Sequence, residues 1–179
     1  MKAALSLIAV GLLSRLLPHP PNAVALGAVA LYAGARLPRR WAVAVPLLIL
    51  LGSDALLDTW NGYPFDLASR SATYLTFAAI ALVSSAVQGR VGVAGRAGMS
   101  VAASTAFYVV SNFAVWAEGS GWSMPATFDG LIACYTVALP FYSNSLAADL
   151  IGTGVLFGLD AAFAWFGRRI ETPVEAATS

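Results

Sequence analysis

Long apolar runs, separated by short polar or proline-rich turns, dominate the pattern along the chain. They cover residues 3–17, 22–37, 41–58, 70–88, 95–117 and 140–167. A hydrocarbon core of about 30 Å takes about 20 helical residues to cross, and backbone groups in lipid must be hydrogen-bonded within their own segment. The pattern therefore predicts an all-α membrane protein in which six transmembrane helices form one bundle over residues 1–170, with a short tail at 171–179.

One shorter apolar piece does not fit this series. Residues 126–139 are followed by Pro140, which has no N–H to donate and favours a break in a helix. The piece is too short to cross a hydrocarbon core by itself. We therefore expect a partial or re-entrant helix before the last span.

Composition supports the membrane assignment. Hydrophobic residues make up 59% of the chain and charged residues 11%, with a mean hydropathy of +0.75, whereas soluble domains carry about 25% charged residues. The net charge of +1 and the lack of a basic run interleaved with aromatics predict no nucleic-acid partner. The single cysteine, Cys134, excludes an internal disulfide and a cysteine-only metal site.

Basic residues gather in turns that six spans would place on one side of the membrane. These turns hold eight of the 10 basic residues, namely Lys2, Arg36, Arg39, Arg40, Arg90, Arg96, Arg168 and Arg169. By the positive-inside rule this side is cytoplasmic, with both termini inside. Residues 14–22, 53–70 and 116–129 then face outward, and they hold the only histidine and most of the tryptophans. We therefore expect the chemistry of the protein on its outer face.

The first outward connection holds His19 between Pro18 and Pro20, on a backbone that these prolines stiffen. Asn22 follows Pro21 and is expected to cap the second helix. His19 fits either an interfacial hydrogen-bonding role or contact with a ligand. No His, Cys and Asp residues stand at the spacing of metal ligands, so the sequence predicts no metal site.

Several polar residues lie within the predicted spans. A charge buried in a membrane needs a partner, so we expect Arg15 to pair with Asp54 or Asp149. The network would either fix helix positions only or also form the floor of a binding cavity. Its members are Arg15, Asp54, Asn112, Asn144 and Asp149.

Aromatic residues are enriched at the outer end. They form either an interface belt or the walls of a cavity for a flat organic ligand. They are Trp60, Tyr63, Phe65, Trp116, Trp122, Phe128, Tyr135, Phe141 and Tyr142.

Small residues recur along one face of the second predicted helix, at Ala23, Gly27, Ala30 and Gly34. Such a stripe lets helices approach closely. It would serve packing within the chain or docking to a partner subunit.

Motifs of several enzyme classes are absent. The chain has no GxxxxGK[ST], no HExxH and no GxSxG. The sequence therefore offers no nucleotide hydrolysis by a P-loop, no zinc peptidase helix and no nucleophile elbow.

Four blocks of the sequence carry a resemblance. They are SRLLPHPPN, the Ser53-Asp54 pair with Asn61-Gly62-Tyr63, SNFAVW, and GLIACYTVALPFYSNSLAADL. Together they resemble an uncharacterised family of small bacterial integral membrane proteins, and so imply a bacterial inner-membrane protein. The six-helix plan is also similar to the substrate-binding S components of energy-coupling-factor vitamin transporters. That resemblance implies a vitamin enclosed by the outer connections, and early helices that dock onto a transmembrane coupling subunit served by ATPases. Some solitary members take up cobalamin.

Three hypotheses follow. In the first, the chain is an S-component-like subunit that has no intrinsic cofactor and captures a small vitamin-like or cofactor-like molecule, a cobalamin among the options, from the outer face. Its site would comprise His19, Asn22, Asp54, Trp60, Tyr63, Asn112, Trp116, Tyr135, Asn144 and Asp149. In the second, it is an enzyme acting on a lipid or isoprenoid, with His19 and Asp54 or Asp149 as acid and base. In the third, it is a structural or assembly subunit.

Overall fold

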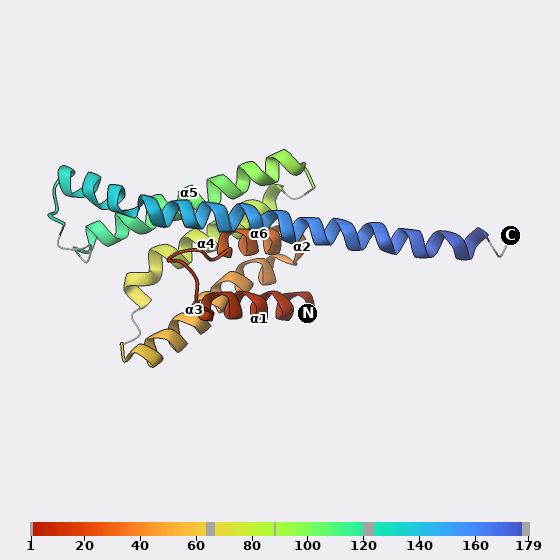
Figure 1. The fold of residues 1–179 in the computed structure, drawn as a ribbon, viewed down its shortest axis with the longest axis horizontal. Coiled ribbons are helices and arrows are strands. Elements are labelled where there is room, and N and C mark those ends of the chain that lie inside the picture. Colours follow the sequence, from red (N-terminus) through yellow and green to blue (C-terminus); the bar gives the residue numbers. More distant parts are fainter. Residues whose placement is uncertain (1, 64–66, 88, 120–123, 177–179) are drawn as a thin grey trace.

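The protein is all-helical in the residues that its computed structural model describes, namely 2–63, 67–87, 89–119 and 124–176, with the side chains of residues 2, 68, 69 and 167–176 left out. Six helices follow one another along the chain (Figure 1). They are α1 (Lys2–Leu16), α2 (Leu26–Arg36), α3 (Arg39–Asn61), α4 (Leu67–Val87), α5 (Val93–Ala117) and α6 (Phe128–Ala176).

Four segments are long and apolar enough to cross a membrane: Arg39–Asn61, Arg70–Val87, Val93–Ala117 and Phe128–Phe166. The chain is therefore a helical membrane protein. The other two helices are shorter, because α1 has 15 residues and α2 has 11, against the roughly 20 that a span needs. A count of six crossings stays a prediction.

Successive helices run in alternating directions, so α1 begins at the same end of the bundle as the one toward which α6 runs (Figure 1). The turn from α2 to α3 and the start of α5 lie at this end too. Arg36, Arg39, Arg40 and Arg96 belong to these segments. The arrangement agrees with the predicted grouping of basic residues, and the side of the membrane on which they lie stays a prediction.

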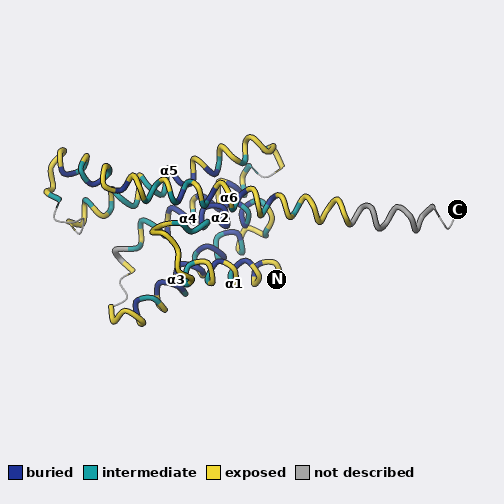
Figure 2. Tube along the Cα trace, viewed as in Figure 1, coloured by how far each residue is buried: buried dark blue, intermediate teal, exposed yellow. Residues whose placement is uncertain are grey.

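Helix α2 forms the centre of the bundle and contacts all five other helices. Eight of its residues are buried, and the surrounding helices expose more of their surface (Figure 2). Small side chains explain this close approach: a Cβ on Gly34 would clash with the Ala81 carbonyl and the Ser84 side chain of α4. The Ser84 hydroxyl also donates to the Leu31 carbonyl of α2, at 2.6 Å.

This position of α2 decides between the two roles predicted for the small-residue stripe. Gly27, Ala30 and Gly34 are buried and Ala23 is half-buried. The prediction that these residues dock a partner subunit is wrong for this structure, because other helices of the same chain already cover them. The stripe serves internal packing.

The partial helix predicted for residues 126–139 is also wrong. Helix α6 runs without a break from Phe128 to Ala176, through Pro140. Packing against α5 on both sides of Pro140 explains the continuity. The Tyr108 hydroxyl of α5 donates to the Tyr135 carbonyl at 2.7 Å, and Thr105 hydrogen-bonds the Tyr142 hydroxyl at 2.9 Å. Pro140 removes one intrahelical hydrogen bond, and these contacts hold the helix against α5 before and after it.

Candidate functional site

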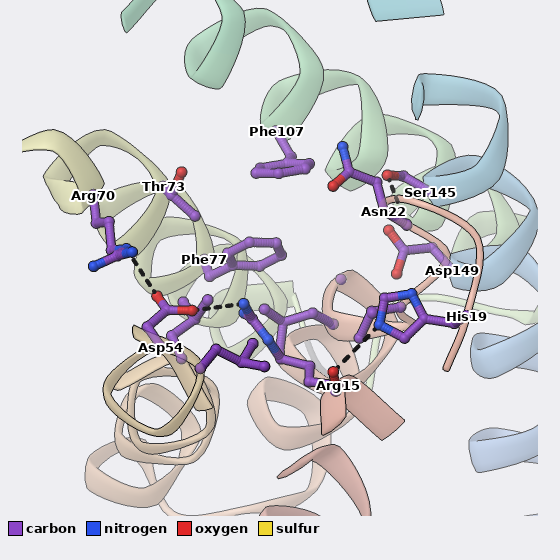
Figure 3. Close-up of a pocket in the computed structure, with 15 residues that line it drawn as sticks. Arg15, His19, Asn22, Asp54, Arg70, Thr73, Phe77, Phe107, Ser145 and Asp149 are labelled. Carbon is purple, nitrogen blue, oxygen red and sulfur yellow. Dashed lines mark hydrogen bonds and ion pairs between the residues drawn. The ribbon is translucent and has the colours of Figure 1, made fainter. Parts of the chain in front are cut away.

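A pocket of about 300 Å³ lies beneath the connection between α1 and α2 (Figure 3). Helices α3 and α4 supply one wall and α5 and α6 another. Among the described residues α3 contacts neither α5 nor α6, so the two helix pairs diverge around this space. The lining includes Arg15, His19, Asn22, Asp54, Arg70, Thr73, Phe77, Phe107, Ser145 and Asp149.

The first wall is a cluster of paired charges around Asp54. The Arg15 guanidinium donates to one Asp54 carboxylate oxygen at 2.6 Å, and the Tyr74 hydroxyl donates to the other at 2.8 Å. Arg70 lies 3.6 Å from Asp54 and binds both oxygens of Asp58, at 2.7 and 2.8 Å. Two arginines thus face two aspartates, and the wall is formally neutral. The expected pairing of Arg15 with an aspartate is found, and Asp54 is the partner.

The second wall is built on Asp149, whose carboxylate is bound by neutral donors. One oxygen accepts the Ala28 backbone N–H at 3.0 Å, and the other accepts the Ser104 hydroxyl at 2.7 Å. Ala28 lies in the first turn of α2, and no side chain of the flanking residue, Ala25, caps that turn. Asp149 of α6 therefore caps α2 from 121 residues away, where a negative charge meets the positive end of the helix dipole.

This finding corrects the role predicted for Asn22 as the helix cap. Helix α2 begins four residues later, at Leu26. Asn22 instead adopts a positive φ of 60°, which asparagine tolerates better than most residues, and its side chain lines the pocket. The turn at Asn22 carries the chain down to the buried start of α2.

Helix α6 holds this connection in place. The Asn144 amide donates to the Pro21 carbonyl at 3.0 Å, and the Ser145 hydroxyl donates to the Asn22 carbonyl at 3.1 Å. The His19 ring lies beside backbone carbonyls, 2.8 Å from that of Pro20 and 3.3 Å from that of Arg15. Asn144 thus acts on the connection, whereas His19 and Asn22 lie at the pocket itself.

Two aromatic rings complete the lining. Phe77 of α4 and Phe107 of α5 lie with their centroids 5.2 Å apart, and the Phe77 ring lies between the Asp54 and Asp149 sides of the pocket (Figure 3). A neighbouring cavity of about 200 Å³ shares Asn22, Phe107 and Ser145 with the pocket, and it includes the predicted Asn112. The site therefore combines a flat apolar surface with polar groups on two sides.

Comparison with protein families places the chain in a family, but that family has no assigned activity. A family model matches residues 1–172, over nearly the whole chain. The chain belongs to the Family of unknown function (DUF6580). No curated protein and no solved structure matches it. The indications of function in this DUF6580 protein therefore lie in its own site.

Some predicted site residues lie away from the pocket. Trp60 and Tyr63 are 80% and 69% exposed, at the far end of α3, and do not line it. The Trp116 indole donates to the Pro125 carbonyl at 3.2 Å, and the Tyr135 hydroxyl donates to the Val109 carbonyl at 2.7 Å. The prediction that these four aromatics form its walls is wrong, because the α5–α6 pair extends away from α3 (Figure 1).

Two further aromatic candidates, Phe65 and Trp122, lie outside the described residues. Among the residues that are described, no three His, Cys, Asp or Glu side chains gather in a group that could hold a metal ion.

Several residues of the site in this DUF6580 protein escaped the sequence analysis, above all Arg70. A signal for it existed: Arg15 and Arg70 are the two basic residues outside the predicted grouping of basic turns, and an arginine within or near a span needs a local partner. Phe77 and Phe107 had no comparable signal, since their spacing is that of any packed helix face.

Proposed function

We propose that this protein is a membrane-embedded subunit that binds a small vitamin-like or cofactor-like molecule from the outer face for uptake. The observation that carries the proposal is the pocket of about 300 Å³ with paired charges on one wall, Asp149 and Asn22 on another, and the rings of Phe77 and Phe107 in its lining. Pockets for small ligands combine apolar and aromatic surface with a few convergent polar groups in this way.

The size of the pocket selects among ligands. Small-molecule sites range from about 300 to 1,000 Å³, so this pocket lies at the small end. It suits a molecule with one or two rings. A cobalamin, with a macrocycle and a nucleotide tail, is far larger, and we therefore do not propose it.

The chemistry of the walls narrows the class further. Arg15 and Asp54 present donors and acceptors from one side, while His19 and Asn22 present polar groups from the other. A planar ring that carries both donor and acceptor groups would stack against Phe107 and reach both sides. A purely apolar ligand would displace water from the remaining donor and acceptor positions of these groups without replacing its hydrogen bonds, and is therefore disfavoured.

The access route supports capture from outside. His19 and Asn22 are exposed and also line the pocket, so they form its rim at the first outward-facing connection. The predicted orientation, with basic turns in the cytoplasm, places this rim on the non-cytoplasmic side. Since the α2 stripe is buried, an energy-coupling subunit would have to contact another surface, and the proposal concerns capture of the ligand.

The two alternatives lack a comparable observation. An acid–base pair for an enzyme would need His19 close to Asp54 or Asp149, yet both ring nitrogens lie against backbone carbonyls and both carboxylates are already hydrogen-bonded. A purely structural subunit would give no reason for an open pocket between these walls.

The test is ligand detection with a pocket-filling variant. Protein purified in mild detergent would be denatured and its extract searched for small molecules by mass spectrometry, and a panel of vitamins and cofactors would be screened by thermal shift. Thr73→Trp fills the pocket from α4 and is expected to abolish any ligand-dependent shift. Ser71→Trp, on an exposed position of the same helix, should keep it.

Two results would count against the proposal. One is folded wild-type protein that carries no compound and responds to none of the panel. The other is a ligand whose binding Thr73→Trp leaves unchanged, because that ligand would occupy another site.

A further inference from the structure

A second site lies at the opposite end of the bundle, where two arginines converge on one ring. The guanidinium carbon of Arg96, from the first turn of α5, lies 4.5 Å from the Phe157 ring centroid, and that of Arg36, from the end of α2, lies 5.9 Å from it. Asp160 pairs with Arg36 at 2.7 Å and accepts the Tyr32 hydroxyl at 3.3 Å. Phe157 and Asp160 both belong to α6.

The charges of this cluster do not balance. Two guanidinium groups face one carboxylate, and among the described residues Arg96 has no carboxylate within ion-pair distance. Its ring contact orients the guanidinium and leaves the N–H groups at its edge free to donate. A guanidinium held in this way matches the oxygens of a phosphate.

A small hollow of about 30 Å³ opens between these arginines and the turn from α4 to α5. Its volume admits phosphate oxygens and excludes an organic ring. Gly89 in this turn has a φ of 79°, and nothing lies within 4 Å of where its Cβ would be, so the approach from the turn is open. The hollow includes Leu31 and Met99 in its lining.

An apolar groove continues from the same two residues. It has a volume of about 330 Å³ and lies between α4 and α5, and Leu31 and Met99 line both it and the hollow. Along α5 it extends from Met99 to Val110, which is about 16 Å of helix. Small side chains, among them Ala79, Ala102 and Ala106, create the space. Its one polar side chain, Thr76, is satisfied by the Ala72 carbonyl at 2.7 Å.

A charged end and an adjoining apolar groove together match one kind of occupant. We propose that Arg36 and Arg96 bind the phosphate of an anionic phospholipid whose acyl chain lies in the groove between α4 and α5. This arrangement suits a lipid in a bilayer. Arg36 at the end of α2 and Arg96 in the first turn of α5 belong to the basic end of the bundle, and the groove follows α5 away from them, from Met99 to Val110. Basic pockets between membrane helices recognise anionic headgroups by this charge complementarity.

The test compares phospholipids with equal acyl chains. Purified protein would be loaded with phosphatidylglycerol or phosphatidylcholine, and retained lipid counted by native mass spectrometry. We expect wild type to retain phosphatidylglycerol preferentially. Arg96→Gln should weaken that preference about fivefold, whereas Arg40→Gln, which removes the same charge from an exposed position outside the hollow, should preserve it.

A second pair of variants tests the acyl groove. Ala102→Leu narrows the groove at an exposed position, so the fold should survive while retention of phosphatidylglycerol falls. Ala9→Leu makes the same change on an exposed face of α1 and should have no effect. Glycerol phosphate, which has the headgroup chemistry without acyl chains, should fail to compete at equal concentration.

Three results would overturn the proposal. Equal retention of the two phospholipids would show that the protein does not recognise the headgroup charge. Equal losses of the phosphatidylglycerol preference in Arg96→Gln and Arg40→Gln would show that any positive charge at this end attracts the lipid. If glycerol phosphate competed and Ala102→Leu did not lower the retention of phosphatidylglycerol, the hollow would bind a free anion and the groove would hold no acyl chain. None of these results depends on a ligand in the outer pocket.

Discussion

Asp54 and Asp149 are buried carboxylates on two walls of one pocket, yet the protein holds them in different ways. Asp54 is surrounded by full charges, with Arg15 and Arg70 nearby and Tyr74 as a further donor. Asp149 is bound by neutral donors, among them the Ala28 backbone amide of α2 and the Ser104 hydroxyl. Ion pairs hold the carboxylate of the first wall, whereas the N-terminal turn of α2 holds the carboxylate of the second.

The difference shows what each wall contributes. The Asp54 cluster joins α1, α3 and α4, so it ties the connection before α2 to the α3–α4 pair. Asp149 joins α6 to α2 and α5, so it sets how deep α2 lies. A ligand between the walls would touch both systems, and substitutions should separate their roles.

The largest effect is expected at Asp54. Asp54→Ala leaves the Arg15 guanidinium without its carboxylate in a mostly buried position, and breaking such a pair costs about 3 kcal/mol or more. Asp54→Asn should cost nearly as much, because an amide supplies no charge. Thermal unfolding in detergent measures both. If Asp54→Asn were as stable as wild type, the first wall would not depend on charge.

A smaller loss is expected at Gly27, where α2 meets the second wall. A Cβ there would clash with the Asp149 carboxylate, so Gly27→Ala must push α6 away from the first turn of α2, at a cost of about 2 kcal/mol. Gly154→Ala, with nothing within 4 Å, is the control and should be neutral or stabilising by up to about 1 kcal/mol. Equal stability of the two variants would contradict the close contact at the second wall.

Asp149 itself should respond differently from Asp54. Asp149→Ala removes the cap of α2 and should cost about 1–2 kcal/mol. In Asp149→Asn the amide oxygen can still accept the Ala28 N–H, and the Ser104 hydroxyl can turn to accept from the amide nitrogen. We therefore expect this variant within about 1 kcal/mol of wild type. A loss as large as that of Asp54→Asn would show that the second wall also needs a full charge.

The smallest effect is expected at Trp60, outside both walls. Its side chain is 80% exposed and does not line the pocket, so Trp60→Ala should change stability by less than about 0.5 kcal/mol. Ligand-dependent thermal shifts should be unchanged as well. Loss of the ligand-dependent shift in this variant would support the predicted aromatic cavity wall at Trp60 and extend the site beyond the two walls.

Periodicity and composition were enough to predict much of the fold. Each long apolar run corresponds to a helix, because backbone groups in lipid have few other ways to be satisfied. The pairing of Arg15 with an aspartate was predictable for a similar reason, since a charge away from water needs a partner. Four predicted residues, His19, Asn22, Asp54 and Asp149, do line one pocket.

Local patterns failed where distant segments decide the outcome. The sequence predicted a helix break at Pro140, yet contacts with α5 on both sides keep α6 continuous. The sequence also predicted that Trp60 forms a cavity wall, but Trp60 does not line the pocket. The sequence does not show in which direction a pair of helices diverges.

By itself, the amino-acid sequence determined the helical membrane class, the grouping of basic residues and the need to neutralise buried charge. Each of these follows from the energy of transferring a local segment or a single group out of water. Only the tertiary structure decided that α2 lies at the centre, that Asp149 caps it from 121 positions away, and that Phe77 and Phe107 meet in the lining of the pocket. These features depend on which surfaces fit together, and shape complementarity between distant segments has no periodic signature in the chain.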